Sequence, residues 1–159
     1  MFAGVYHWFP KMYGRMMNKN LGYLHFWGTF ICAYGVFFPM HFLGLAGLPR
    51  RYYTNSNFPM FDGLSDINEI ITFFALAGAI FQAVFIFNFV YSIFKGTKAS
   101  KNPWKSNTLE WTTPIERIHG NWPGDLPVVK RWAYDYSKPG MSHDFVPQDV
   151  PLFEGEKEH

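Results

Sequence analysis

Two long uncharged stretches dominate the pattern of hydrophobic and polar positions along the chain. From Leu21 to Pro49, and again from Ile70 to Phe94, the sequence contains no Asp, Glu, Lys or Arg. Each stretch exceeds the roughly 20 apolar residues that are needed to cross the hydrocarbon core of a bilayer. We therefore predict two transmembrane helices, because two such stretches in succession are unusual for the core helices of a soluble protein.

The two ends of the chain differ from these stretches and from each other. Residues 1–10, MFAGVYHWFP, are apolar from the first position but too few to span a membrane, and they lack the charged leader of a signal peptide. We interpret them as the end of a truncated transmembrane helix. After residue 94, charged, aromatic and turn-forming residues alternate without apolar periodicity. This predicts an extended, partly ordered tail, with disorder as the alternative for about the last fifteen residues.

Charges in the loops indicate how the two spans are oriented. Lys11, Arg15 and Lys19 precede the first span with no acid among them, and four lysines follow the second span. By the positive-inside rule these segments are cytoplasmic, and the acidic connecting loop lies outside. The chain is thus predicted to be an all-α transmembrane polypeptide with the end of a truncated span at 1–10, a cytoplasmic loop at 11–20, a transmembrane helix at 21–49, a periplasmic loop at 50–69, a transmembrane helix at 70–94 and a cytoplasmic C-terminal tail at 95–159.

Composition favours a membrane protein and narrows the chemistry. Only 16% of the 159 residues are charged, against about 25% in average soluble domains. A net charge of +2 gives no reason to expect a nucleic-acid partner. The single cysteine, Cys32, allows no intrachain disulfide, and the six histidines show no ligand spacing. We expect no metal site and no catalytic residue within this chain, although a haem-facing role for His41 stays open.

Small and polar residues in the spans predict contacts between helices. In the first span, glycines and alanines alternate with bulky aromatic residues, and small residues let a neighbouring backbone or a flat ligand approach closely. In the second span, Gln82, Asn88 and Ser92 are the main polar residues. We expect them to form interhelical hydrogen bonds rather than a transport path.

Two adjacent arginines, Arg50 and Arg51, stand at the predicted outer end of the first span, where the positive-inside rule does not favour cations. One interpretation is that they complement the dipole at a helix C-terminus and extend toward water. The other is that they bind fixed anions, because a guanidinium pairs bidentately with carboxylate or phosphate and neighbouring residues project in different directions. Gly44 and Gly47 would leave room there for a large group, such as a haem with its propionates or a lipid phosphate.

Three segments resemble, in order and spacing, the C-terminal part of subunit I of haem–copper cytochrome c oxidases: VYHWFPKMYG, HFWGTFICAYGVFFPMHFLGLAGLPRRY and NTLEWTTP. They are similar to the end of the tenth transmembrane helix of that family, to its eleventh and twelfth helices and to the start of its cytoplasmic tail. The resemblance covers residues 1–114. The following segment, IERIHGNWPGDLPVVKRWAYDYSKPG, is similar to the tail of bacterial, Bacteroidetes-type members.

The resemblance implies a function for the whole protein and a role for the arginines. In the family the paired arginines bind the propionates of two haems, which makes Arg50 and Arg51 the expected cofactor-binding residues. The complex reduces oxygen to water with electrons from cytochrome c, pumps protons, lies in the bacterial inner membrane and contains subunits II and III. The histidines that ligate iron and copper lie upstream of the matching segments. We therefore expect this segment to need the rest of subunit I and to be inactive alone.

Two departures from the family pattern and two alternative functions qualify this expectation. Met40 stands where the motif usually has glutamine, and Tyr53, Thr54 and Asn55 include no acid of the kind that binds calcium or sodium in some members, so no such site is predicted. The first alternative is a segment of a quinol oxidase of the same superfamily. The second is a two-span membrane anchor or assembly protein without redox function.

Overall fold

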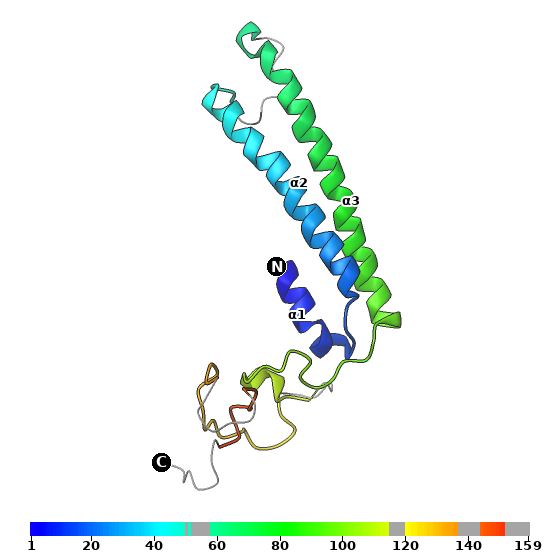
Figure 1. The fold of residues 1–159 in the computed structure, drawn as a ribbon, viewed down its shortest axis with the longest axis vertical. Helices are drawn as coiled ribbons and strands as arrows, with labels where there is room; N and C mark the ends of the chain where they lie inside the picture. The colour runs from blue at the N-terminus through cyan, green and yellow to red at the C-terminus, as the bar shows by residue number, and fades with distance from the viewer. Residues whose placement is uncertain (50, 52–57, 115–119, 137–143, 152–159) are drawn as a thin grey trace. The chain divides into compact units, whose positions relative to one another are not determined.

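The computed structural model describes residues 1–49, 51, 58–114, 120–136 and 144–151. Its elements, shown in Figure 1, are the helices α1 (Phe2–Tyr13), α2 (Lys19–Leu45) and α3 (Ser65–Lys95) and the 3-10 turns η1 (Pro59–Leu64) and η2 (Leu109–Trp111). The described residues contain no β-strand beyond one isolated bridge. The prediction of an all-helical chain with two long apolar helices is confirmed.

The chain divides into two compact units. One unit comprises Asn18–Phe94 and holds the two long helices, which run side by side (Figure 1). The other comprises Met1–Met17 together with the chain from Lys95 onward, so that α1 and the tail belong to one unit.

Both long helices are long and apolar enough to cross a membrane. Helix α2 has 27 residues; it begins two residues before the predicted start at Leu21 and ends at Leu45, four residues before the predicted end at Pro49. Helix α3 has 31 residues and extends past the predicted 70–94 at both ends, so that it includes Asp66, Glu69 and Lys95. In the most apolar part of α2, 17% of the residues are buried within the chain. In the most apolar part of Pro59–Lys95, which comprises η1 and α3, 6% are buried. A core helix of a soluble protein is mostly buried, so this exposure favours a lipid or protein environment around both helices.

Glycines on one face of α2 bring the two long helices together. A Cβ atom added to Gly28 would lie 2.2 Å from the ring of Phe81, and one added to Gly35 would lie 2.4 Å from the ring of Phe74. The two glycines are seven residues apart and therefore share a helix face. Two phenylalanine rings of α3 occupy the space that side chains at these positions would fill.

Polar groups fasten the same two helices at two levels. Near the middle, Gln82 Nε2 donates to Thr29 Oγ1 at 3.0 Å. At the other level Asn18, whose side chain caps the start of α2, has its backbone N–H and C=O bonded to the side-chain amide of Asn88 at 3.1 Å each. Ser92 donates to Asn88 Oδ1 at 3.1 Å, and both side chains are fully buried. These contacts bear out the interhelical hydrogen bonds expected of Gln82, Asn88 and Ser92.

Within the other unit, the two chain segments that lead to and from the long helices pair with each other. The N–H of Met16 donates to the carbonyl of Thr97 at 2.8 Å, and that of Ala99 donates to Gly14 at 2.9 Å. The Arg15 guanidinium donates to the carbonyl of Gly96 at 2.7 Å. The start of the tail is therefore held beside the end of α1 by backbone and side-chain bonds.

The tail is organised around polar side chains rather than a large apolar core. The side chain of Gln148 accepts from the N–H of Leu109 at 2.8 Å and donates to the carbonyl of Arg131 at 3.0 Å. Its backbone bonds to Asn107 and Lys130 at 3.2 and 2.8 Å. Disorder is the alternative expected for about the last fifteen residues; of these, residues 145–151 are described and take part in this hydrogen-bond network, and residues 152–159 lie outside the described residues.

Candidate functional site

Helix α2 ends in a motif that turns the chain sharply before the arginine pair. Gly47, two residues after Leu45, has a φ of 85°, which favours glycine because a Cβ is strained there. Its N–H donates to Gly44 at 3.1 Å, and the N–H of Leu48 donates to Leu43 at 3.0 Å. This pair of bonds is the Schellman arrangement that satisfies the last carbonyls of a helix. The sequence GLP therefore stops the helix and leads the chain away from its axis.

The two predicted cofactor-binding residues differ in how the structure describes them. Arg51 is exposed and has a φ of 66°, in the left-handed region that residues other than glycine seldom adopt. Among the described residues Arg51 has no ion-pair partner. Arg50 lies outside the described residues, as do Tyr53, Thr54 and Asn55. The pair as a unit thus stays a prediction, and for Arg51 alone the structure shows an exposed side chain beyond the end of α2.

Open space lies beside the last turn of α2, as the sequence predicts. A Cβ added to Gly44 or Gly47 would meet no atom of the described residues within 4 Å. In this respect they differ from Gly28 and Gly35, whose missing side chains are replaced by phenylalanine rings of α3. Packing between α2 and α3 therefore gives no reason for a glycine at position 44.

A shallow apolar groove of about 440 Å³ follows one face of α2 toward the same end. It is lined by residues spaced three or four apart, from Phe30 and Tyr34 to His41. His41 Nδ1 lies 3.0 Å from the carbonyl of Phe37, four residues earlier. The carbonyl can only accept, so Nδ1 is the donor in this contact, and Nε2 is the ring nitrogen that this contact does not use. The haem-facing role left open for His41 is compatible with this orientation.

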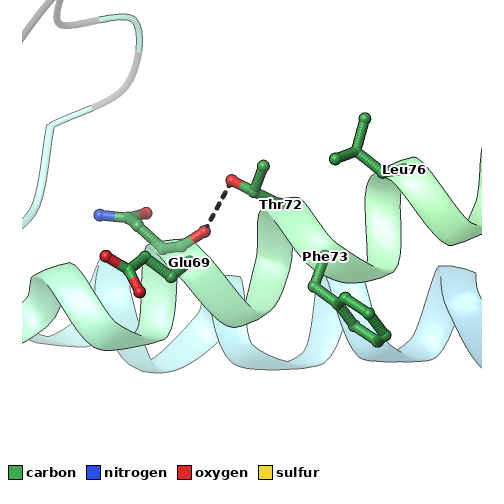
Figure 2. A pocket seen from close by; sticks show the side chains of 5 residues that line it. Glu69, Thr72, Phe73 and Leu76 are labelled. Atoms are coloured by element: carbon green, nitrogen blue, oxygen red, sulfur yellow. Dashed lines mark hydrogen bonds between the residues drawn. The ribbon is translucent and has the colours of Figure 1, made fainter.

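A second shallow hollow, of about 400 Å³, lies on the first turns of α3 (Figure 2). Figure 2 shows the Thr72 hydroxyl turned back toward the helix backbone, where it donates to the carbonyl of Asn68 at 2.8 Å. Phe73 and Leu76 supply apolar surface, and Glu69 supplies one carboxylate. All of these residues belong to one helix, so the hollow is a helix surface rather than an enclosed site. It offers no paired acid and base for catalysis.

A polar and aromatic cluster, formed by α1 and the start of the tail, has no counterpart among the sequence predictions. The Glu110 carboxylate lies 3.7 Å from His7 Nε2 and accepts from Trp8 Nε1 at 3.3 Å. The His7 ring is stacked at 5.6 Å on Trp104 and meets Trp111 edge-on at 5.2 Å. The only signal in the sequence is the presence of tryptophan in both HWFP and LEW, because the contacts join residues about a hundred positions apart.

Lys11 extends this cluster at the end of α1. Its ammonium group donates to the carbonyl and the hydroxyl of Thr113 and lies 5.5 Å from the centre of the Trp111 ring. Burial lowers the pKa of Lys11 below its ordinary value of 10.5, because an ammonium loses hydration there, while the negative charge of Glu110 opposes this shift. The cluster therefore joins α1 to the tail through charge, hydrogen bonds and ring contacts, and it has no nucleophile paired with a base.

Metal ligands do not gather in the described part of the chain. No group of three or more His, Cys, Asp or Glu residues there could hold a metal ion. Cys32 is buried on α2, where a Cβ added to Gly78 of α3 would lie 3.4 Å from its own Cβ atom. This arrangement makes Cys32 a packing residue between the two helices.

Comparisons with known proteins point in one direction. The family described as Cytochrome C and Quinol oxidase polypeptide I matches residues 1–80, which is half of the chain. The chain is 49% identical, over 153 residues, to the alternative cytochrome c oxidase subunit 1 of Bradyrhizobium diazoefficiens. It is 44% identical over 136 residues to the cytochrome c oxidase subunit 1 of Thermostichus vulcanus, and 43% identical over 137 residues to that of Synechocystis sp..

Each match covers most of this chain but only a small share of the relative. They include 95% of this chain but 26% of the Bradyrhizobium protein, and 86% of this chain but 24% of each of the other two. The chain thus spans about a quarter of the length of these curated relatives, consistent with a C-terminal part of such a subunit. With half of the chain matched by the family and with 49% identity to a subunit 1 over 95% of the chain, this chain belongs to the cytochrome c and quinol oxidase polypeptide I family.

Proposed function

We propose that this chain is the C-terminal segment of the catalytic subunit of a terminal oxidase, which reduces oxygen to water with electrons from cytochrome c and couples this reaction to proton pumping. The observation that carries the proposal is the 49% identity, over 95% of the chain, to a protein named as a cytochrome c oxidase subunit 1. The two long apolar helices, joined by buried polar contacts, suit a segment that completes a larger helix bundle.

The contribution of this segment to the reaction is electrostatic. Arg50 and Arg51 would hold the propionates of the two haems of the oxidase, whose irons supply electron transfer and oxygen reduction when bound. The fit is supported by the exposed Arg51, which has no ion-pair partner in the described part of the chain, and by the open space beside Gly44 and Gly47. A guanidinium near a carboxylate keeps that carboxylate ionised. Its positive charge also disfavours the oxidised, more positive state of a nearby haem iron.

The setting of the segment follows from its charges. Lysines and arginines flank the ends of the spans that join the α1-and-tail unit, whereas the loop between α2 and α3 contains acids. We propose that the chain lies in the bacterial inner membrane with its C-terminus in the cytoplasm. Its partners would be the rest of subunit I, subunits II and III, membrane lipid, and cytochrome c as the electron donor of the complex.

The arginines can be tested in the assembled oxidase. We expect Arg51→Ala and Arg50→Ala each to shift the midpoint potential of a haem by an amount on the order of 59 mV, the equivalent of a tenfold change for a one-electron couple. Arg51→Lys should shift it less, because the charge is retained and only the bidentate fork is lost. The measurement is a spectroscopic redox titration together with the rate of oxygen consumption.

A matched control removes a cation at the start of α2, the end of the helix that is farther from the arginines in the sequence. Lys19→Ala deletes an exposed charge at the start of α2, far along the helix from Arg51, and should leave both haem potentials unchanged. If both arginine variants retain wild-type potentials and turnover, the propionate role is excluded.

The two alternative functions predict other results. A quinol oxidase would take electrons from a quinol but not from reduced cytochrome c, so donor-dependent oxygen consumption of the purified complex separates the two branches. A non-redox anchor or assembly protein would purify without haem and would tolerate the double replacement of Arg50 and Arg51. The names of the relatives favour the cytochrome c branch.

A further inference from the structure

The side chain of His7, on α1, lies among aromatic rings and beside a carboxylate. Its imidazole is stacked on the ring of Trp104, with the centroids 5.6 Å and the planes 18° apart. It meets the rings of Trp8 and Trp111 edge-on, with centroids 5.7 and 5.2 Å apart. The Glu110 carboxylate lies 3.7 Å from its Nε2 atom. These five residues, here called the His7 cluster, join α1 to the start of the tail within one compact unit.

Two hydrogen bonds position the imidazole whatever its charge. Trp104 Nε1 donates to the backbone carbonyl of His7 at 2.9 Å, and Trp8 Nε1 donates to the Glu110 carboxylate at 3.3 Å. An indole N–H is a donor only and keeps its proton. The side chains of His7 and Glu110 are 41% and 47% exposed, so that water can deliver a proton to them. The cluster is therefore already formed when His7 is neutral, and a proton adds an interaction to it.

Protonation of His7 adds attraction between α1 and the tail. A histidine side chain changes charge between about pH 5 and pH 8. The imidazolium is attracted to the Glu110 carboxylate and to the face of the Trp104 ring, because the face of an aromatic ring is its negative side. Both partners belong to the tail, whereas His7 belongs to α1. The added attraction is therefore present at low pH and is lost as the pH rises and His7 becomes neutral.

Lys11 opposes this effect with a like charge. It follows His7 by four residues on α1, where two cations repel each other weakly. Its ammonium group is bonded to Thr113 and lies 5.5 Å from the centre of the Trp111 ring. In the described part of the chain, His7 and Glu110 form no ion pair other than the one with each other. Because Glu110 is at ion-pair distance from His7 while Lys11 is bonded elsewhere, we expect the attraction to exceed the repulsion.

From these contacts we infer that protonation of His7 strengthens the attachment of residues 104–113 of the tail to α1, which makes the His7 cluster a pH-sensitive contact built into the fold. The inference goes beyond the proposed function, because it rests on contacts within one compact unit and uses neither the haem-binding role of the arginines nor the placement of the long helices. The effect is graded, since two hydrogen bonds of the cluster do not depend on the proton.

Hydrogen–deuterium exchange of the assembled oxidase, followed by mass spectrometry at about pH 6 and about pH 8, measures this attachment. Labelling times are scaled to the intrinsic exchange rate at each pH, so that the comparison reports protection alone. Peptides from residues 104–113 should be about threefold more protected at the lower pH, as expected for a partly exposed charge contact. The amides of Met16 and Ala99, which bond to backbone carbonyls in the same unit, should be equally protected at both pH values.

Two replacements of His7 separate its charge from its ring. His7→Phe keeps an aromatic ring that binds no proton, and His7→Arg keeps a planar group that is always charged. In both variants the protection of residues 104–113 should be the same at the two pH values, and it should be higher in His7→Arg than in His7→Phe. Glu110→Gln should reduce the pH dependence, because the imidazolium loses its carboxylate partner. An unchanged haem absorption spectrum shows for each variant that the oxidase is assembled.

Equal protection of residues 104–113 at both pH values in the wild-type oxidase would overturn the inference. A His7→Phe variant that keeps the wild-type pH dependence would also overturn it, because the titrating group would then lie elsewhere. Neither result affects the redox titration of the arginine variants, which tests the proposed function separately.

Discussion

The glycines of α2 are of two kinds, which differ in whether an added methyl side chain would meet other atoms. At positions 28 and 35 the missing side chain is replaced by a phenylalanine ring of α3, at distances that no real Cβ atom tolerates. At position 44 nothing in the described chain is near. The first two glycines thus serve packing between α2 and α3, whereas no packing contact of the described residues accounts for the third.

We predict that Gly28→Ala destabilises the oxidase, because the Phe81 ring must move to admit the new methyl group. The free energy of unfolding should fall by about 1–3 kcal/mol, the usual cost of overpacking. The measurement is the thermal unfolding of the purified complex in detergent, followed by circular dichroism.

Two companion variants separate overpacking from a general effect of alanine. Gly44→Ala should be tolerated by the helix pair, since its Cβ meets no atom within 4 Å. Phe81→Ala combined with Gly28→Ala should be less destabilising than the sum of the two single changes, because removing the ring clears the space. Strict additivity of the two changes would argue against the Gly28–Phe81 contact.

At the scale of helices, α2 and α3 are joined most firmly where α2 begins. Asn18 caps α2 with its side chain, while its backbone bonds to the side-chain amide of Asn88. The Ser92 hydroxyl donates to the oxygen of that amide. One residue thus starts a helix and fastens it to its neighbour. Burial in a membrane-facing helix makes these bonds hard to replace by water.

Asn88→Leu should weaken the helix pair by about 1–2 kcal/mol. It removes two bonds to Asn18 and the acceptor of Ser92, and hydrogen bonds between membrane helices are worth roughly 0.6 kcal/mol each, with additional cost for the buried groups left without a partner. The yield of haem-containing complex after detergent extraction and its thermal inactivation midpoint report the loss.

Gln82→Leu provides the comparison, because Gln82 makes one side-chain bond, to Thr29. It should cost less than Asn88→Leu in the same assay. An equal or larger effect of Gln82→Leu would contradict the view that the start of α2 is the firmer attachment.

At the scale of the whole molecule, α1 and the tail form a unit in which no single apolar core dominates. Gln148 bonds to the carbonyls of Arg131 and Asn107 and to the N–H of Leu109. The cluster of Glu110 and Lys11 attaches the tail to α1. Such a unit depends on each polar group finding its partner, because leaving a buried polar group without a hydrogen bond costs more free energy than a formed bond contributes.

Gln148→Ala should therefore open the tail without affecting the haems. It leaves the N–H of Leu109 and the carbonyl of Arg131 without their side-chain partner. Limited trypsin digestion of the assembled oxidase should cut after Lys130 or Arg131 several-fold faster than in the wild type, while the haem spectrum stays the same. Val150→Ala shortens an exposed side chain of the same segment and should leave the cleavage rate unchanged.

The described structure also shows where a sequence pattern is sufficient. The two long helices are predictable because their length and lack of charge are local properties, and a bilayer requires about 20 apolar residues whatever surrounds them. The hydrogen bonds of Gln82 and Asn88 are predictable in kind, since polar side chains on such helices need partners. The end of α2 follows from glycine and proline in GLP, which satisfy the last carbonyls and prevent continuation.

The sequence by itself thus determined the helical class, the family motifs and the candidate role of Arg50 and Arg51. Only the tertiary structure decided which glycine of α2 meets a ring of α3, that His7 and Trp8 meet Glu110, and that Arg131 is buried while its neighbours are exposed. These features depend on contacts between residues far apart in the chain. No local period encodes such contacts, because each depends on the backbone bringing two distant segments within a few ångströms of each other.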